Sequence, residues 1–206
     1  MRLRLCLMLL FVAVLPASAT AQQRWAGHWV NVDPADYAMF VLDIQPDAQV
    51  HQLMPAPQFQ AKYRVEGGHL VMRMADGSAD SSFALRGDSL IGRGPDAMVR
   101  IAGSVVEKSG VRGTWRAVAT AQGNAFMTLR SDAEVVLEVG VPVVSSWLGD
   151  TLRLTSAQVP SAAYTMRQAG DTLHAVDATG KDHRFVRRPW GCLGISSFDT
   201  PAPECR

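Results

Sequence analysis

Apolar and polar residues alternate along most of the chain with a period of two. Residues 58–66 are the clearest example, because Phe59, Ala61, Tyr63 and Val65 fall on one face and polar residues occupy every even position. This alternation is typical of a β-strand with one buried face and one solvent-facing face. Outside the N-terminal apolar run, no stretch of ten or more residues has convincing helical spacing. The pattern therefore predicts an all-β protein.

Gly- and Asp-rich turn sequences, such as Glu66-Gly67-Gly68 and Gly149-Asp150, separate these strands at short intervals, as expected for antiparallel hairpins. The pattern predicts sixteen short strands, eight in each half of the chain. Those of the first half are expected near 27–33, 38–45, 48–54, 57–66, 69–75, 80–86, 88–93 and 97–103. Those of the second half are expected near 113–120, 124–130, 133–140, 142–148, 151–155, 162–168, 171–177 and 181–188.

The two halves share an ordered series of short matches. Gly27-His28-Trp29 matches Gly113-Thr114-Trp115, and Asp47-Ala48 matches Asp132-Ala133. An internal repeat of this length predicts two copies of one structural unit. Because closing a sheet removes its unpaired edges, we expect two tandem antiparallel meander barrels of about eight short strands each. They are expected at residues 22–105 and 111–188, joined by a polar linker around 106–110 and followed by a C-terminal tail at 189–206.

The N-terminus has the three regions of a secretory signal peptide. Arg2 and Arg4 precede an apolar run at residues 5–15, and small residues follow at the positions that signal peptidase reads. We expect residues 1–21 to be removed. No later stretch is long and apolar enough to span a bilayer, and Cys6 lies too early for a lipid-acceptor cysteine. The sequence thus predicts a periplasmic or secreted protein with no membrane span and no lipid anchor.

Two cysteines, Cys192 and Cys205, remain after the signal peptide is removed. An even pair in an oxidising compartment favours a disulfide, here one that closes a short loop in the tail. The alternative is a redox-active or metal-binding thiol pair. It is less favoured because the spacing is wider than C-x-x-C and no histidine lies between the two.

Other chemistry finds little support in the residues. The formal net charge is only +1, so the chain has no broad electrostatic footprint for nucleic acid. None of the five histidines has metal-ligand spacing, and each is expected as a polar residue on a strand face: His28, His51, His69, His174 and His183. There is no G-x-S-x-G motif and no phosphate-binding loop. The sequence therefore predicts no catalytic residue, no metal site and no cofactor, and it favours a non-enzyme.

Each half begins with Gly-x-Trp and continues as a strand meander with a Gly-Asp-x-Leu hairpin, and the last strand is basic. This pattern resembles the lipocalin-like (calycin-type) domains of exported bacterial proteins. The resemblance implies that the tryptophan of each half closes the base of its own barrel, under an arginine from that barrel's last strand. By resemblance, Trp115 meets Arg187 or Arg188, and Trp29 meets Arg100. A guanidinium can stack on indole while donating to backbone carbonyls.

Two functions are compatible with these features. The first is an exported lipocalin-like protein that binds a small apolar ligand, since the apolar strand faces are rich in Met, Leu and Phe. The alternative is an envelope interaction or inhibitor module that contacts another protein through its loops and its tail. Trp190 and Phe198 would be the aromatic anchors of that tail.

Overall fold

The structure of the chain is a computed structural model. It describes residues 23–33, 36, 41–56, 61–77, 81–93, 97–101, 110–118, 125–157, 160–193 and 205. The predicted signal peptide and most of the predicted linker lie outside these ranges.

All sixteen predicted strands are confirmed. They are β1 (Gly27–Asn31), β2 (Val41–Ile44), β3 (Val50–Pro55), β4 (Ala61–Glu66), β5 (His69–Met74), β6 (Ser81–Arg86), β7 (Ser89–Ile91), β8 (Ala97–Arg100), β9 (Gly113–Ala117), β10 (Ala125–Leu129), β11 (Glu134–Gly140), β12 (Val144–Leu148), β13 (Thr151–Thr155), β14 (Ala162–Ala169), β15 (Thr172–Asp177) and β16 (Asp182–Arg187). Among the described residues there is no α-helix, only a short 3₁₀ turn at η1 (Gln23–Trp25).

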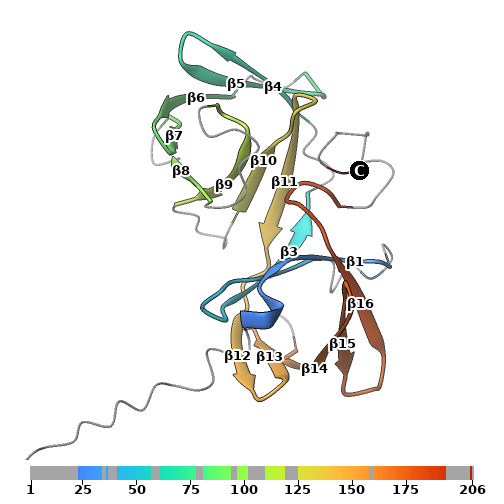
Figure 1. Ribbon diagram of the computed structural model, residues 1–206. Helices are drawn as coiled ribbons and strands as arrows, with labels where there is room; N and C mark the ends of the chain where they lie inside the picture. Colours follow the sequence, from blue (N-terminus) through green and yellow to red (C-terminus); the bar gives the residue numbers. More distant parts are fainter. Residues whose placement is uncertain are drawn as a thin grey trace, which may run out of the picture.

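Strands β4 to β11 form a closed eight-stranded antiparallel barrel, which we call the closed barrel (Figure 1). Each strand pairs with the next one along the chain. The first part of β11 then returns to β4, where Glu134 is paired with Lys62 and Val135 with Ala61. Alternate residues of these strands point inward and fill the interior, which is rich in methionine, leucine and aromatic side chains around Trp115.

The other eight strands form a second body, which we call the outer sheet. Its order is β3-β2-β1-β16-β15-β14-β13-β12, so the first strand of the chain pairs with the last. The two ends of this sheet meet through side chains: the Val50 amide donates to Ser145 Oγ at 3.1 Å, and the Trp147 indole donates to the Ala48 carbonyl at 2.7 Å. A second hydrophobic core around Trp29 and Phe185 fills its concave side.

The expectation of two tandem barrels is wrong in its connectivity. The closed barrel takes β4–β8 from the first predicted domain and β9–β11 from the second, and the outer sheet takes the remaining strands of both. Strand β8 pairs with β9 directly across the predicted linker, with Arg100 opposite Trp115. The reason is that antiparallel ladders are chemically alike, so a strand can pair with the matching edge of the other half as well as with its own.

The two bodies are joined along one ladder and one core. Strand β11 extends beyond its ladder with β4 and pairs there with β3, with Val139 opposite Met54, while its other edge stays paired with β10 (Figure 1). A third hydrophobic cluster packs where the bodies meet. Its buried members are Val30, Val41, Leu53, Phe126, Val136 and Leu193.

Candidate functional site

The tryptophan–arginine pairs exist, but with exchanged partners. The Arg100 guanidinium lies 4.2 Å from the Trp115 ring centroid, and that of Arg187 lies 4.7 Å from the Trp29 ring centroid. The predicted pairing of Trp29 with Arg100 and of Trp115 with Arg187 or Arg188 is therefore wrong. The exchange of strands between the halves is the cause. Arg188 takes part through its backbone amide, which donates to the His28 carbonyl at 3.1 Å.

The glycine of the Gly-x-Trp motif has a local physical role in the outer sheet. Gly27 has φ +149°, and a Cβ placed there would lie 3.3 Å from Cζ and Nε of Arg187. Glycine thus leaves space for the guanidinium to reach Trp29. The Trp29 indole donates to the Trp25 carbonyl at 2.7 Å, and the Trp115 indole donates to Val111 in the same way at 2.8 Å. Both pairs support the fold and carry no reactive group.

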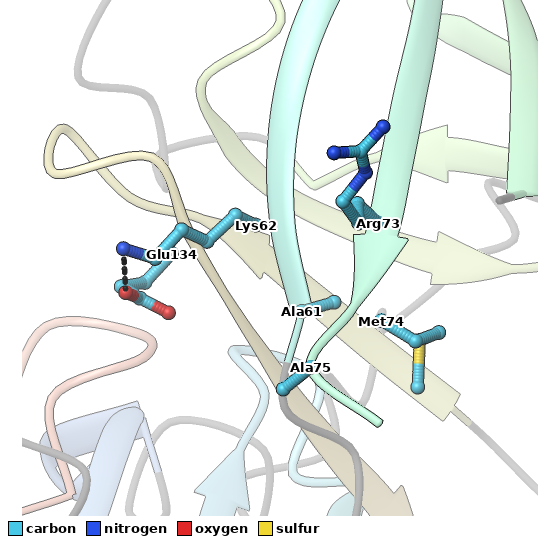
Figure 2. Close-up of a pocket in the computed structure, with 6 residues that line it drawn as sticks. All are labelled: Ala61, Lys62, Arg73, Met74, Ala75 and Glu134. Atoms are coloured by element: carbon cyan, nitrogen blue, oxygen red, sulfur yellow. Dashed lines mark ion pairs between the residues drawn. The ribbon is translucent and has the colours of Figure 1, made fainter. Parts of the chain in front are cut away.

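A groove of about 330 Å³ opens at the end of the closed barrel where β4 begins and β5 ends. Ala61, Met74 and Ala75 provide its apolar surface (Figure 2). Arg73 and the Lys62–Glu134 pair, whose Nζ and Oε1 atoms are 3.5 Å apart, provide its charged surface. The groove borders the methionine-rich interior, because Met74 packs against the core and Ala61 belongs to it.

A second cavity, of about 480 Å³, lies on the outer sheet beside η1. Its lining is mainly polar: Arg24, Trp25, Asp150, Met166, Arg167, Gln168 and Gly170. Arg24 lies over the Trp25 ring at 4.3 Å and is held by Asp150 at 2.8 Å. Trp25 is almost completely buried under this arginine. The cavity therefore presents charged groups to solvent rather than an aromatic face.

Ionisable side chains are buried where the two bodies meet. His28 Nε2 on β1 lies 3.2 Å from Glu138 Oε1 on β11, and both side chains are almost fully buried. Asp43, opposite His28 in the β1–β2 ladder, is also buried. We call His28, Asp43 and Glu138 the junction cluster. Burial penalises a charge without full compensation, and it lowers the pKa of His28 to about 3.

The same burial raises, rather than lowers, the pKa values of the two carboxyl groups, Asp43 and Glu138. It raises the pKa of Asp43 to about 7, against a hydrogen bond from Gln45. It raises the pKa of Glu138 to about 8, with a further increase from the Asp43 charge and a decrease from the Gly191 backbone amide. At neutral pH, therefore, His28 is uncharged and Glu138 carries a proton. Their 3.2 Å contact therefore brings together two buried neutral groups, and among the described residues neither makes a regular side-chain hydrogen bond.

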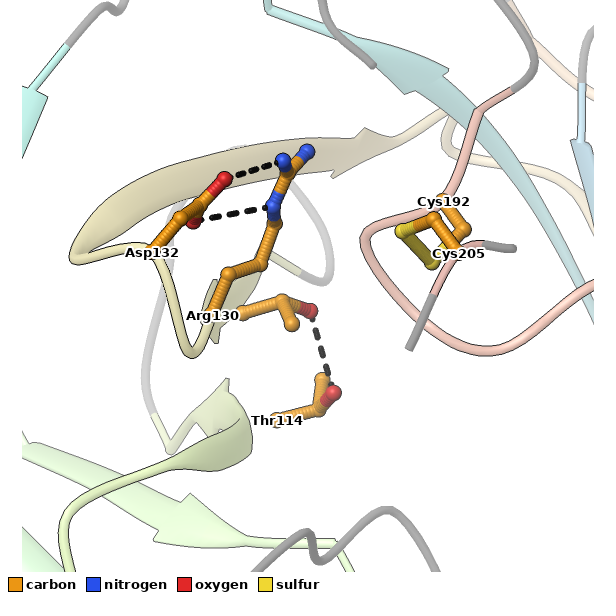
Figure 3. The surroundings of a disulfide bond; sticks show 6 residues. Thr114, Arg130, Asp132, Cys192 and Cys205 are labelled. Carbon is orange, nitrogen blue, oxygen red and sulfur yellow. Dashed lines mark hydrogen bonds and ion pairs between the residues drawn. A yellow bond between two sulfur atoms is a disulfide. The ribbon is translucent and has the colours of Figure 1, made fainter. Parts of the chain in front are cut away.

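The C-terminal tail covers this junction cluster. Trp190 lies 4.2 Å from the His28 ring and stacks on Phe126 at 5.0 Å between centroids. The sulfurs of Cys192 and Cys205 are 2.00 Å apart, at disulfide distance, and Cys192 is buried. Figure 3 shows this pair with the Arg130–Asp132 ion pair in its surroundings. Trp190 thus packs internally but stays partly exposed, and its role as a contact for another protein remains a prediction; Phe198 lies outside the described residues.

A second buried histidine lies in the outer sheet. His183 contacts Asp36 through Nδ1, and its Nε2 is 3.5 Å from Asp177 Oδ2. Lys181 donates to the same Asp36 oxygen at 3.1 Å. Burial acts to raise the pKa of Asp36, but the hydrogen bonds and charges of Lys181 and His183 outweigh it and lower that pKa.

The prediction that every histidine is a polar residue on a strand face is wrong for His28 and His183. Period two could have identified His183, which has the same parity as the core residue Phe185. For His28 no such signal exists, because both faces of β1 are buried.

No cluster of three or more potential metal ligands is found among the described residues. Within the same part of the chain, no helix is long and apolar enough to cross a bilayer. Comparison with family models, curated proteins and solved structures finds no significant match.

Proposed function

We propose that this protein is an exported, lipocalin-like binding protein that takes a small apolar ligand at the groove of the closed barrel. The observation that carries the proposal is the groove itself, which Ala61, Met74 and Ala75 line at one end of a closed, methionine-rich barrel. Ligand sites in barrels are commonly found at such ends, and methionine adapts its shape to varied apolar ligands. The predicted signal peptide supports export.

The size and charge of the groove indicate what kind of ligand fits. A volume of about 330 Å³ lies at the lower end of the range for small-molecule sites, which favours a compact molecule over a long acyl chain. Lys62 and Arg73 at the rim favour a ligand whose polar end is acidic. The outer-sheet cavity suits an apolar ligand less well, because its lining is mainly polar.

Binding of an anionic naphthalene probe tests this proposal. 8-Anilinonaphthalene-1-sulfonate combines an apolar body with an acidic group, and its fluorescence rises when it leaves water. We expect saturable binding to the mature protein. Ala75 is exposed in a turn, so Ala75→Trp fills the groove without disturbing the core, and it should weaken probe binding at least about tenfold by steric exclusion.

Ala178→Trp provides the matched control, because Ala178 is also exposed in a turn but lies on the outer sheet. It should bind the probe as the unmodified protein does. Equal binding by all three proteins, or none by the unmodified protein, would show that the groove is not the site.

We also infer that the chain arose by duplication of one eight-stranded unit, whose copies then exchanged strands. Matching positions support this history. Ala48 and Ala133 have positive φ values of 69° and 66°, and the preceding aspartates each accept from the amide two residues on, at 3.1 and 3.2 Å. Met54 and Val139, which the offset of the Asp-Ala match relates, pair with each other, as expected at a pseudo-two-fold axis.

The alternative, an interaction or inhibitor module, depends on a tail whose described aromatic residue packs internally. We therefore place it second.

A further inference from the structure

The junction cluster lies between the two bodies and not within either interior. His28 belongs to β1 of the outer sheet, and Glu138 to the part of β11 that has left the β4 ladder and pairs with β3. Among the described residues, the buried side-chain nitrogens of His28 and oxygens of Glu138 have no regular hydrogen-bond partner. Within the junction cluster, the 3.2 Å contact of His28 with Glu138 therefore connects the outer sheet to the closed barrel.

The corresponding place in the closed barrel is built without any charge. Thr114 and Thr128 are ladder partners on β9 and β10, as His28 and Asp43 are on β1 and β2. Their hydroxyl oxygens are 3.0 Å apart and both residues are buried. A ladder of this kind therefore needs no ionisable group. Burying three such groups is costly, which indicates that the cluster has a role other than folding.

The described residues 189–193 of the tail close the cluster without adding a titratable group. Trp190 covers the His28 ring, and the Gly191 amide points to Glu138. The other ionisable groups that face the cluster come from the strands around it. Asp43 acts on Glu138, while Arg116 and Asp47 act on His51, which lies opposite Asp43 on β3.

We propose that the His28–Glu138 contact is a proton-dependent latch between the closed barrel and the outer sheet. It is closed while Glu138 keeps its proton and the neutral acid lies beside His28 Nε2. When that proton passes to solvent, the resulting carboxylate faces Asp43, and in the described part of the chain the Gly191 amide and the neutral imidazole are what oppose that repulsion. The ladder between β3 and β11 and the tail over it then open, and the ion becomes hydrated.

Hydrogen–deuterium exchange of the mature protein tests the latch. Rates are measured from pH 6 to pH 9 and corrected for the pH dependence of intrinsic exchange. We expect protection of β1, β3 and β11 to fall about tenfold between pH 7 and pH 9, because one pH unit above the pKa the ionised form exceeds the protonated form about tenfold. Strands β13–β15, which lie away from the junction, should keep their protection.

Two variants identify the group responsible. Glu138→Gln keeps a neutral hydrogen-bond donor and should abolish the alkaline loss of protection. Glu134→Gln, on the same strand but paired with exposed Lys62, is the matched control and should retain it. Asp43→Asn should move the transition to lower pH, because a like charge has been removed. A loss that is unchanged in Glu138→Gln, or no loss in the unmodified protein, would overturn the proposal.

The test remains decisive if Glu138→Gln does not fold. The ¹³C shift of the Glu138 carboxyl carbon in the unmodified protein then reports its titration directly. A transition above pH 7 that coincides with the loss of protection supports the latch. A transition below pH 5 would overturn it.

Discussion

The guanidinium of Arg100 lies 4.2 Å from the Trp115 ring centroid, so the last strand of the first half closes onto the first strand of the second. Arg100 also donates to the carbonyls of Arg112, at 2.7 Å, and Gly110, at 2.5 Å. One side chain therefore holds the connection between the two halves through stacking and hydrogen bonds. The equivalent contact of Arg187 with Trp29 joins the two ends of the chain.

Arg100→Ala should destabilise the protein by about 2 kcal/mol, because it removes a cation–π contact and leaves two carbonyls without their donor. The free energy of unfolding in urea measures the loss. Arg93→Ala changes an exposed arginine and should stay within about 0.5 kcal/mol of the unmodified protein. Similar losses in both variants would contradict the structural role of Arg100.

Exchange of strands between the halves predicts which fragment folds by itself. A fragment of residues 56–143 contains all eight strands of the closed barrel and should unfold cooperatively in urea. A fragment of residues 22–105, the first predicted tandem domain, lacks β16, the second partner of β1, and β9, the second partner of β8, and should not. Far-UV circular dichroism follows both. If only the 22–105 fragment unfolded cooperatively, the tandem arrangement of two barrels would be supported instead.

Gly191→Ala should destabilise by about 2 kcal/mol or more. Its φ is +76°, and an added Cβ would lie 2.7 Å from Cγ2 of Thr128, so the variant has both backbone strain and a clash. Gly180→Ala separates the two effects, since Gly180 has φ +86° with nothing within 4 Å. It should lose only about 1 kcal/mol, the backbone part. Thermal unfolding measures the loss of stability in Gly191→Ala and Gly180→Ala. Equal losses in the two variants would mean that the close approach to Thr128 is unimportant.

Acid should weaken the fold through His28. Burial lowers its pKa from 6.5 to about 3, so between these values the unfolded chain binds a proton that the folded chain does not. Stability therefore falls as the pH is lowered from 6.5 to 3, by at most about 5 kcal/mol from this group. His28→Gln removes the group and should flatten that part of the curve of unfolding free energy against pH. Parallel curves for the two proteins would exclude His28 as the cause.

Much of the secondary structure could be read from residue order alone. The alternation of apolar and polar residues, together with the turn sequences between them, places most of the strands, because side chains of a half-buried strand point to opposite faces in turn. Gly-Asp turns give the hairpins, since those residues tolerate positive φ. Two cysteines in a predicted export context were enough to propose the pair at 192 and 205.

Strand partners across long distances were not determined in this way. Backbone donors and acceptors are the same at every residue, so nothing in the local pattern tells β9 whether to pair with β8 or with β16. Tertiary packing determined the strand partners. The length of β11, the β3–β11 ladder and the packing of Trp190 between the bodies favour the exchanged arrangement. The same packing brings His28 next to Glu138 across 110 positions of sequence, and the low polarity there, not the residue types, gives both groups their unusual pKa values.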